Sequence, residues 1–281
     1  VSTRKVEIIT EELCGKKFSK STVSALCKKL DPIIEAFRTR PLKCHYPFVV
    51  VDAIYVKVRE NGRIRSRGLL IAIGINEEGY REVIGFQLAN SESESCWGEF
   101  FSSLKERGLK NVDLVTSDDH KGLVNAVKRH FQGAVWQRCQ THFSKNILDH
   151  TPKTLQPELK EELCQLYEAV DLESARSIRD RIIQTYEAKA PKATAILDEA
   201  FDDITAVLAL PLKYRKRLRT TNSVERLNQE IRRRERVIRI FPNTASVIRL
   251  MGALLMEQDE RWQTGRKYFD MQLYYQIRNE K

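Results

Sequence analysis

Three acidic side chains stand where carboxylates could bind divalent cations. Asp52 lies in an apolar, β-branched run over residues 46–59, which predicts a strand buried on both faces. Asp118 directly follows a short predicted strand over 112–117, and Glu225 lies on a strongly basic helix. Such a set of acids can hold two cations about 3.5–4 Å apart, which activate the attacking oxygen and stabilise the leaving oxygen of a phosphodiester displacement. Hard oxygen ligands favour Mg²⁺ or Mn²⁺.

Each acid, taken alone, also has a structural explanation. A buried carboxylate is costly unless it is partnered, so Asp52 could be neutralised by an arginine instead of a metal. Aspartate is a common N-cap, and Asp118 and Asp119 stand at a strand-to-helix junction. We expect Asp118 to be the ligand, with Asp119 and His120 capping the helix and supporting the site. Glu225 could form only surface salt bridges, which contribute little.

Residues 44–143 predict the elements that would position the two aspartates. They are strands over 46–59, 64–75 and 80–88, a helix capped by Ser91 and Ser93 and ending near Gly108, a strand over 112–117, a helix over 120–131 and a strand over 134–138. Asn61-Gly62 is a strong turn signal between the first two strands. This order indicates an α/β protein with a ribonuclease-H-like mixed sheet flanked by helices, and we expect ligands at the C-terminal strand ends.

The N-terminal segment, 1–43, predicts two short helices around a turn. The first covers about 3–13, and the second covers 22–30 with Ser19 or Ser21 as its cap. The pattern fits a DNA-binding helix-turn-helix and an ordinary helical hairpin about equally. Residues 36–42 are expected to connect this segment to the main domain.

Residues 144–210 predict an all-helical insertion, and 211–281 the last part of the core. Between residues 149 and 203 there are 13 acidic and 7 basic residues, so the acidic face of the insertion is not expected to lie along DNA. Between Leu212 and Arg239 the balance reverses to 11 basic residues and 3 glutamates. The candidate phosphate-binding side chains in this basic stretch are Arg217, Arg219, Asn222, Arg226, Arg232, Arg233 and Arg234. An apolar helix over 244–262 is expected to cover the sheet.

Composition agrees with a polyanionic partner. The formal net charge is +10, and the isoelectric point is about 9.3. No apolar run has the length of a membrane span, no signal-peptide core is present, and the six cysteines form no CxxC pair, so we expect a cytoplasmic protein with reduced thiols. The chain begins at Val1, and we expect its natural N-terminus to be missing.

Four stretches together resemble the Mutator-type transposases of bacterial insertion sequences, which belong to the DDE superfamily. They are Asp52-Ala-Ile-Tyr-Val-Lys-Val-Arg, Ser117-Asp-Asp-His-Lys-Gly-Leu, Gln137-Arg-Cys-Gln-Thr-His and Thr221-Asn-Ser-Val-Glu-Arg-Leu-Asn-Gln-Glu-Ile-Arg-Arg-Arg. The similarity covers essentially all of 1–281. Members usually carry glycine where this chain has Asp119, and their chains extend further N-terminally.

The resemblance implies a catalytic triad of Asp52, Asp118 and Glu225 that binds two Mg²⁺ or Mn²⁺ ions, with a helical domain inserted before the glutamate. The family's Cys-x-x-His motif falls on Cys139 and His142, which are candidates to support the site. A structural zinc site would need four ligands, and the sequence offers no second pair.

The same resemblance implies a function on DNA. Double-stranded DNA with terminal inverted repeats would be cleaved at the element's ends, and the freed 3′-hydroxyl would attack target DNA. A dimer in the bacterial cytoplasm, associated with the nucleoid, is expected. The alternatives are a metal-dependent nuclease on the same fold and a truncated, non-catalytic DNA-binding remnant.

Overall fold

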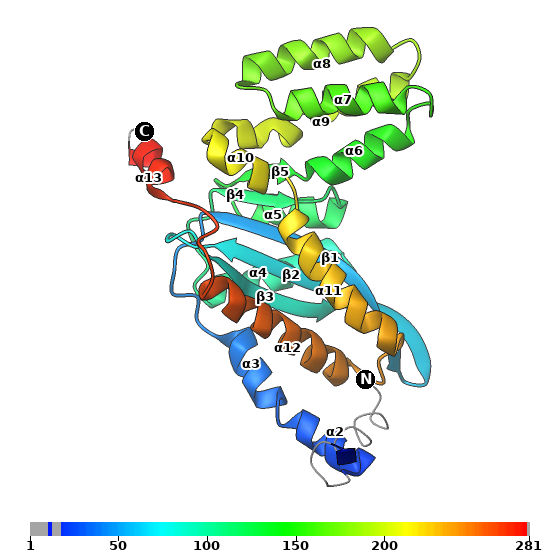
Figure 1. The fold of residues 1–281 in the computed structure, drawn as a ribbon, viewed down its shortest axis with the longest axis vertical. Coiled ribbons are helices and arrows are strands. Elements are labelled where there is room, and N and C mark those ends of the chain that lie inside the picture. The colour runs from blue at the N-terminus through cyan, green and yellow to red at the C-terminus, as the bar shows by residue number, and fades with distance from the viewer. Residues whose placement is uncertain (1–10, 13–17, 280–281) are drawn as a thin grey trace.

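A five-stranded mixed sheet forms the centre of the computed structural model, which describes residues 11–12 and 18–279 (Figure 1). The strands, in the spatial order β3-β2-β1-β4-β5, are β1 (Phe48–Glu60), β2 (Arg63–Ile75), β3 (Arg81–Ala89), β4 (Leu114–Ser117) and β5 (Val135–Arg138). β1, β2 and β3 form an antiparallel meander, whereas β4 and β5 run parallel to β1. The predicted α/β class and the five predicted strands are confirmed. No helix among the described residues has the length and apolarity needed to cross a membrane.

The β1–β2 hairpin turns where the sequence predicts it. Asn61 and Gly62 both have positive φ, 48° and 76°, which matches the two-residue turns that follow the right-handed twist of paired strands. Along β1 the side chains alternate between two apolar layers, with Val50 and Ile54 in one layer and Val49 in the other. Asp52 therefore shares the face of Val50 and Ile54.

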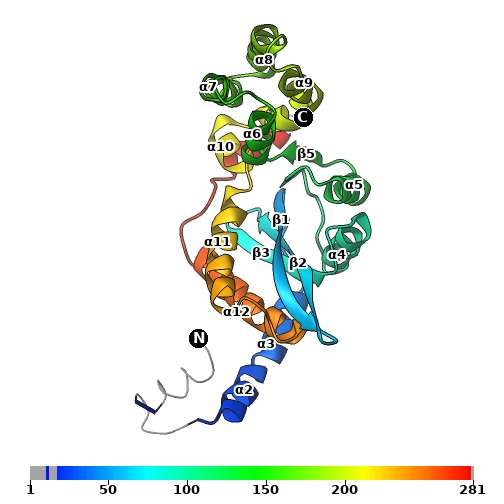
Figure 2. The same cartoon turned by 90° about the vertical axis from the view of Figure 1, so that its right-hand side faces the viewer.

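Helices cover both faces of the sheet (Figure 2). α4 (Glu94–Glu106) and α5 (Lys121–His130) pack on one face, and α11 (Asn222–Ile238) and α12 (Thr244–Gln263) pack on the other, the face of Asp52. Ser93 caps α4 by accepting a hydrogen bond from the backbone N–H of Cys96, as predicted. The apolar side of α11 is formed by Val224, Leu227 and Ile231, which are all buried.

In the described part of the N-terminal segment, a helix occupies most of the stretch that was expected to be a connector. Ser19 caps α2 (Lys20–Lys28), whereas the first predicted helix lies outside the described residues except for 11–12. The expected connector over 36–42 is wrong at its start, because α3 (Asp31–Thr39) continues through it. A proline in the first turn of α3 favours helix initiation, and Ile34 packs so closely on α12 that a Cβ at Gly252 would lie 2.4 Å from its Cγ2.

The helical insertion stands at one end of the molecule with its own apolar core (Figure 1). Its elements are α6 (Gln140–Asp149), α7 (Gln156–Tyr167), α8 (Leu172–Tyr186), α9 (Pro191–Thr205) and the 3₁₀ turn η1 (Ala206–Ala209). The side chains of Gln137 and Gln140 both donate to the carbonyl of Ile204, over 3.0 and 2.7 Å. These buried amides fix the end of the insertion against β5.

After the insertion the chain returns to the core through α10 (Leu212–Leu218). The end of the described chain forms α13 (Gln272–Asn279), which was not predicted. The Tyr274 ring packs edge-on against Phe48 of β1, with ring centroids 5.0 Å apart. The C-terminal segment is therefore part of the apolar core.

Candidate active site

Asp52 and Asp118 lie side by side on neighbouring parallel strands. Val50 of β1 pairs with Thr116 of β4, so two residues further on Asp52 stands level with Asp118, where β4 has just ended. Asp52 is 9% exposed, and its two oxygens accept hydrogen bonds from the backbone N–H of Ala53 (2.8 Å) and from Asn228 Nδ2 (2.7 Å). Its side-chain partner is thus a neutral amide and not an arginine.

The two aspartates share a site that penalises negative charge. Burial, followed by the charge of Asp118, raises the pKa of Asp52 to about 7. Burial also raises the pKa of Asp118, against the opposing effect of the nearby His142 and His120. Two carboxylates that are costly to ionise together favour a bound cation.

Glu225 is placed by a short linker that is tied to the strand ends. Thr116 Oγ1 donates to the carbonyl of Leu218 over 2.7 Å, and the N–H of Thr221 donates to Cys139 Sγ over 3.3 Å. Helix α11 starts immediately afterwards, so Glu225 lies in its first turn, where the helix dipole favours an acid. Thr221 Oγ1 donates to Glu225 Oε1 over 3.3 Å. The Glu225 side chain is 30% exposed.

His142 connects Glu225 to the aspartates. Its Nε2 lies 3.8 Å from Glu225 Oε1. The adjacent Cys139 raises the pKa of His142 to about 9 against the effect of burial, with further contributions from Asp118 and Asp52. Hydrogen bonds from His142 and Thr221 lower the pKa of Cys139, although burial alone would raise it. A cationic imidazole therefore offsets the charge of the acids in this arrangement.

The donor set of the site fits a hard divalent cation. Besides the three carboxylates, the site contains Asn228 Oδ1, which is buried and has no hydrogen-bond partner among the described residues. Within that part of the chain the three carboxylates do not all approach within 4.8 Å of one another, whereas atoms of Cys139, His142 and Glu225 do. Those three ligands fall short of the four that a structural zinc site requires.

The predicted role of Asp119 as a helix cap is wrong. The N-cap residue of α5 is His120, and it makes no side-chain capping bond. Asp119 instead pairs with Arg138 of β5, with 2.9 Å between Oδ2 and Nη1. The reason is that Arg138, on the neighbouring strand, lies within ion-pair distance of this carboxylate, so Asp119 pairs across the strand ends and does not turn back to cap α5.

Some of the candidate phosphate-binding side chains already form hydrogen bonds or ion pairs within the protein, and others do not. Arg217 donates to the carbonyl of Tyr268, Arg219 donates to that of Tyr167, and both Arg233 and Arg234 pair with Glu230. The exposed, unoccupied candidates within the described chain are Asn222, Arg226 and Arg232.

Two residues of the site were not predicted. Asn228 stands one helical turn after Glu225 and holds Asp52, and only its spacing on α11 could have indicated this. Glu92 follows β3, and its pKa is raised by burial and then by the charge of Asp118. Nothing in the local sequence marks Glu92 as a neighbour of the aspartates.

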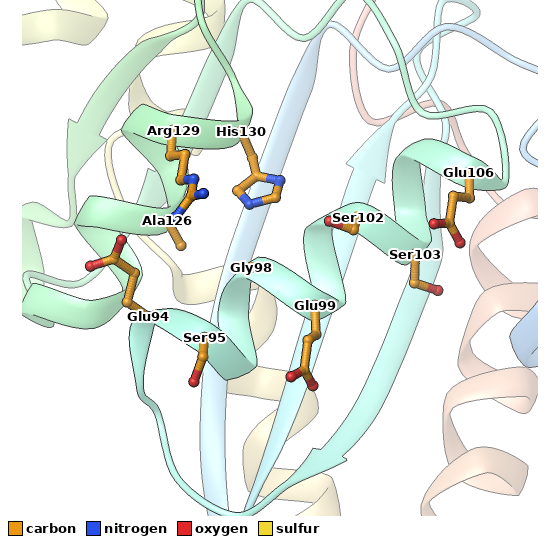
Figure 3. A pocket seen from close by; sticks show the side chains of 10 residues that line it. All are labelled: Glu94, Ser95, Gly98, Glu99, Ser102, Ser103, Glu106, Ala126, Arg129 and His130. Atoms are coloured by element: carbon orange, nitrogen blue, oxygen red, sulfur yellow. The ribbon is translucent and has the colours of Figure 1, made fainter.

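A separate pocket lies between α4 and α5 (Figure 3). Its charged lining consists of Glu94, Glu99, Glu106, Arg129 and His130. It shares no lining residue with the site of the three acids, and we assign it no part in their chemistry.

Comparison with known proteins decides the family. The family model described as transposase, Mutator family, matches residues 1–265. The chain belongs to the Mutator family of transposases. Among its relatives, the transposase for insertion sequence element IS256 in transposon Tn4001 of Staphylococcus aureus is 45% identical over 274 residues, covering 96% of this chain and 70% of the relative. The transposase for ISRM5 of Rhizobium meliloti is 44% identical, with coverage of 96% and 68%. That for IS1081 of Mycobacterium tuberculosis is 43% identical, with coverage of 99% and 67%.

Proposed function

We propose that this chain is a DNA transposase of the DDE type, in which Asp52, Asp118 and Glu225 bind two Mg²⁺ or Mn²⁺ ions. The observation that carries the proposal is the buried Asp52 within β1 beside the half-buried Asp118, which follows the neighbouring parallel strand β4, with Glu225 on a basic helix linked to both through His142. Family membership supports DNA as the substrate.

The residues of the site would act as follows. The two aspartates and Glu225 hold the cations, and Asn228 orients Asp52 through its 2.7 Å hydrogen bond. When bound, the cations activate a water or a 3′-hydroxyl and stabilise the leaving oxygen. His142 and Cys139 support Glu225, and the exposed Asn222, Arg226 and Arg232 contact phosphates.

Several finer features belong to the same proposal. The strand order β3-β2-β1-β4-β5, with a parallel pair beside the meander, supports a ribonuclease-H-like core made of 44–143 and 211–281 around an insertion at 144–210. Segment 1–43 is proposed to bind DNA, with α2 as the second helix of a helix-turn-helix. Terminal inverted repeats and target DNA are the proposed partners, and two ends held together imply a dimer on nucleoid DNA.

Strand joining tests the function. A pre-cut duplex with a terminal 3′-hydroxyl, carrying the terminal repeat of the element, is incubated with plasmid and Mg²⁺ or Mn²⁺. Covalent joining of the 3′-end to the plasmid supports a transposase. Cleavage without joining would indicate a nuclease, and binding without either would indicate a non-catalytic remnant.

A further inference from the structure

A basic groove opens beside the candidate active site and extends onto the helical insertion. Residues of α6 and α7 line one side, and residues of α10 and the start of α11 line the other. Four cationic side chains line it, Lys145, Lys160, Lys216 and Arg219, against one acid, Asp149. A concave surface with this charge balance attracts anions.

The lysines of the groove are available to a ligand. Lys145, Lys160 and Lys216 are all exposed, and none of them forms an ion pair with a described residue. They come from three different helices, α6, α7 and α10, and line the same groove. Free lysines around a groove are the side chains that neutralise phosphates in nucleic-acid sites.

Arginines hold the walls of the groove together. Arg219 Nη1 donates to the carbonyl of Tyr167 over 3.0 Å, at the C-terminus of α7. Arg215 donates to the carbonyls of Leu210 and Val170, both over 2.7 Å. Cations at the carboxyl end of a helix satisfy its free carbonyls, and these bonds fix the insertion against α10. The groove is therefore built into the fold.

The groove is continuous with the site of the three acids. Thr220 and Asn222 line it on both sides of Thr221, which donates to Glu225. Helix α6 contributes Lys145 to the groove and His142 to the site. The insertion is acidic overall, but of its 13 acids between residues 149 and 203 only Asp149 lines the groove. The side of the insertion nearest the site is thus its basic side.

We propose that this groove binds the phosphate backbone of the substrate DNA where the DNA extends from the active site onto the helical insertion. Lys145, Lys160 and Lys216 are the proposed phosphate contacts. The inference rests on the proposed DNA chemistry and adds the insertion to the substrate-binding surface.

The salt dependence of DNA binding tests the groove. The variant combines Lys145→Gln, Lys160→Gln and Lys216→Gln. The control combines Lys153→Gln, Lys189→Gln and Lys192→Gln, which removes the same charge from exposed lysines of the insertion outside the groove. Anisotropy of a fluorescein-labelled DNA duplex gives the affinity between about 50 and 200 mM salt, and thermal unfolding checks that all proteins are folded.

Loss of three phosphate contacts should make the slope of log K against log salt shallower by about 2.7, because each contact contributes about 0.9. Over the fourfold salt range this corresponds to about 40-fold less salt-induced loss of affinity than in the wild type. The control should keep the wild-type slope. A groove variant with the wild-type slope, or a control as shallow as the groove variant, would overturn the proposal.

Nicking of the same DNA, measured in parallel, separates this proposal from the proposed function. If the wild type nicks and the groove variant keeps its slope, only the groove is refuted. If the wild type never nicks while the groove variant loses slope, the groove stands and the proposed chemistry is refuted.

Discussion

Asn228 fixes the orientation of Asp52, and its removal tests how tightly the acids must be held. Asn228 Nδ2 donates to Asp52 Oδ2 over 2.7 Å from a side chain that is 6% exposed. In Asn228→Ala the Asp52 carboxylate stays buried and keeps only the N–H of Ala53 as its partner. A hydrogen bond to a charged group contributes about 1.5–3 kcal/mol. Because 1.4 kcal/mol corresponds to a factor of ten, we expect metal-dependent nicking to slow by about 10–100-fold, as is typical for groups that orient metal ligands.

The loss should also depend on pH. The pKa of Asp52 is already raised to about 7, and removal of a donor to its carboxylate raises it further, so the variant needs a higher pH to ionise this ligand. The assay compares nicking by the wild type, Asn228→Ala and the control Gln229→Ala over a range of Mg²⁺ concentration and pH. Gln229 is the exposed neighbouring amide on α11. A folded Asn228→Ala protein with wild-type rates and pH profile would show that Asn228 does not orient Asp52.

Three further predictions concern the surroundings of the site. The raised pKa of His142, about 9, means that its contribution to stability is fully present below about pH 6.5 and is lost as the pH rises through 9. Urea unfolding in EDTA measures the free energy of unfolding at pH 6.5 and above pH 9. Because the side chain is 40% exposed, this free energy should fall by only about 1–2 kcal/mol more in the wild type than in His142→Gln between the two pH values, and equal falls would contradict the prediction. Gly252→Ala should lower the free energy of unfolding by about 1–3 kcal/mol, because the new Cβ would stand 2.4 Å from Ile34 Cγ2; an unchanged melting temperature would count against that packing. Asp119→Gly should leave nicking unchanged and cost up to about 1 kcal/mol in urea unfolding, since its pair with Arg138 is half open to water, whereas a large loss of nicking would place Asp119 in the site.

The elements that local chemistry defines could be predicted from the sequence. The strand through Asp52, the Asn61-Gly62 turn and the Ser93 cap each depend on a few neighbouring residues, and the structure confirms them. The buried side of α11 was predicted from helical spacing alone, because Val224, Leu227 and Ile231 recur at intervals that share one face.

The features that depend on long-range contacts could not be predicted. Asn228 is one of several polar residues on α11, and only the fold brings it to Asp52, 176 positions earlier in the chain. The basic residues between Leu212 and Arg239 look alike in sequence. The structure separates Arg219, which holds the insertion, from Arg232, which remains free within the described chain. The capping role expected for Asp119 failed for the same reason, since its partner Arg138 comes from the next strand.

The proposed chemistry requires that Asp52, Asp118 and Glu225 bind the metal ions that activate the cleavage of DNA. The most direct test is nicking of a duplex carrying the terminal repeat of the element, in Mg²⁺ or Mn²⁺, by the wild type and by Asp52→Asn. The amide keeps the size of the side chain and leaves DNA binding to the basic residues, so binding serves as the control for folding. We predict that the wild type nicks and leaves a 3′-hydroxyl, whereas Asp52→Asn binds equally and does not nick. Equal nicking by both proteins would contradict the claim.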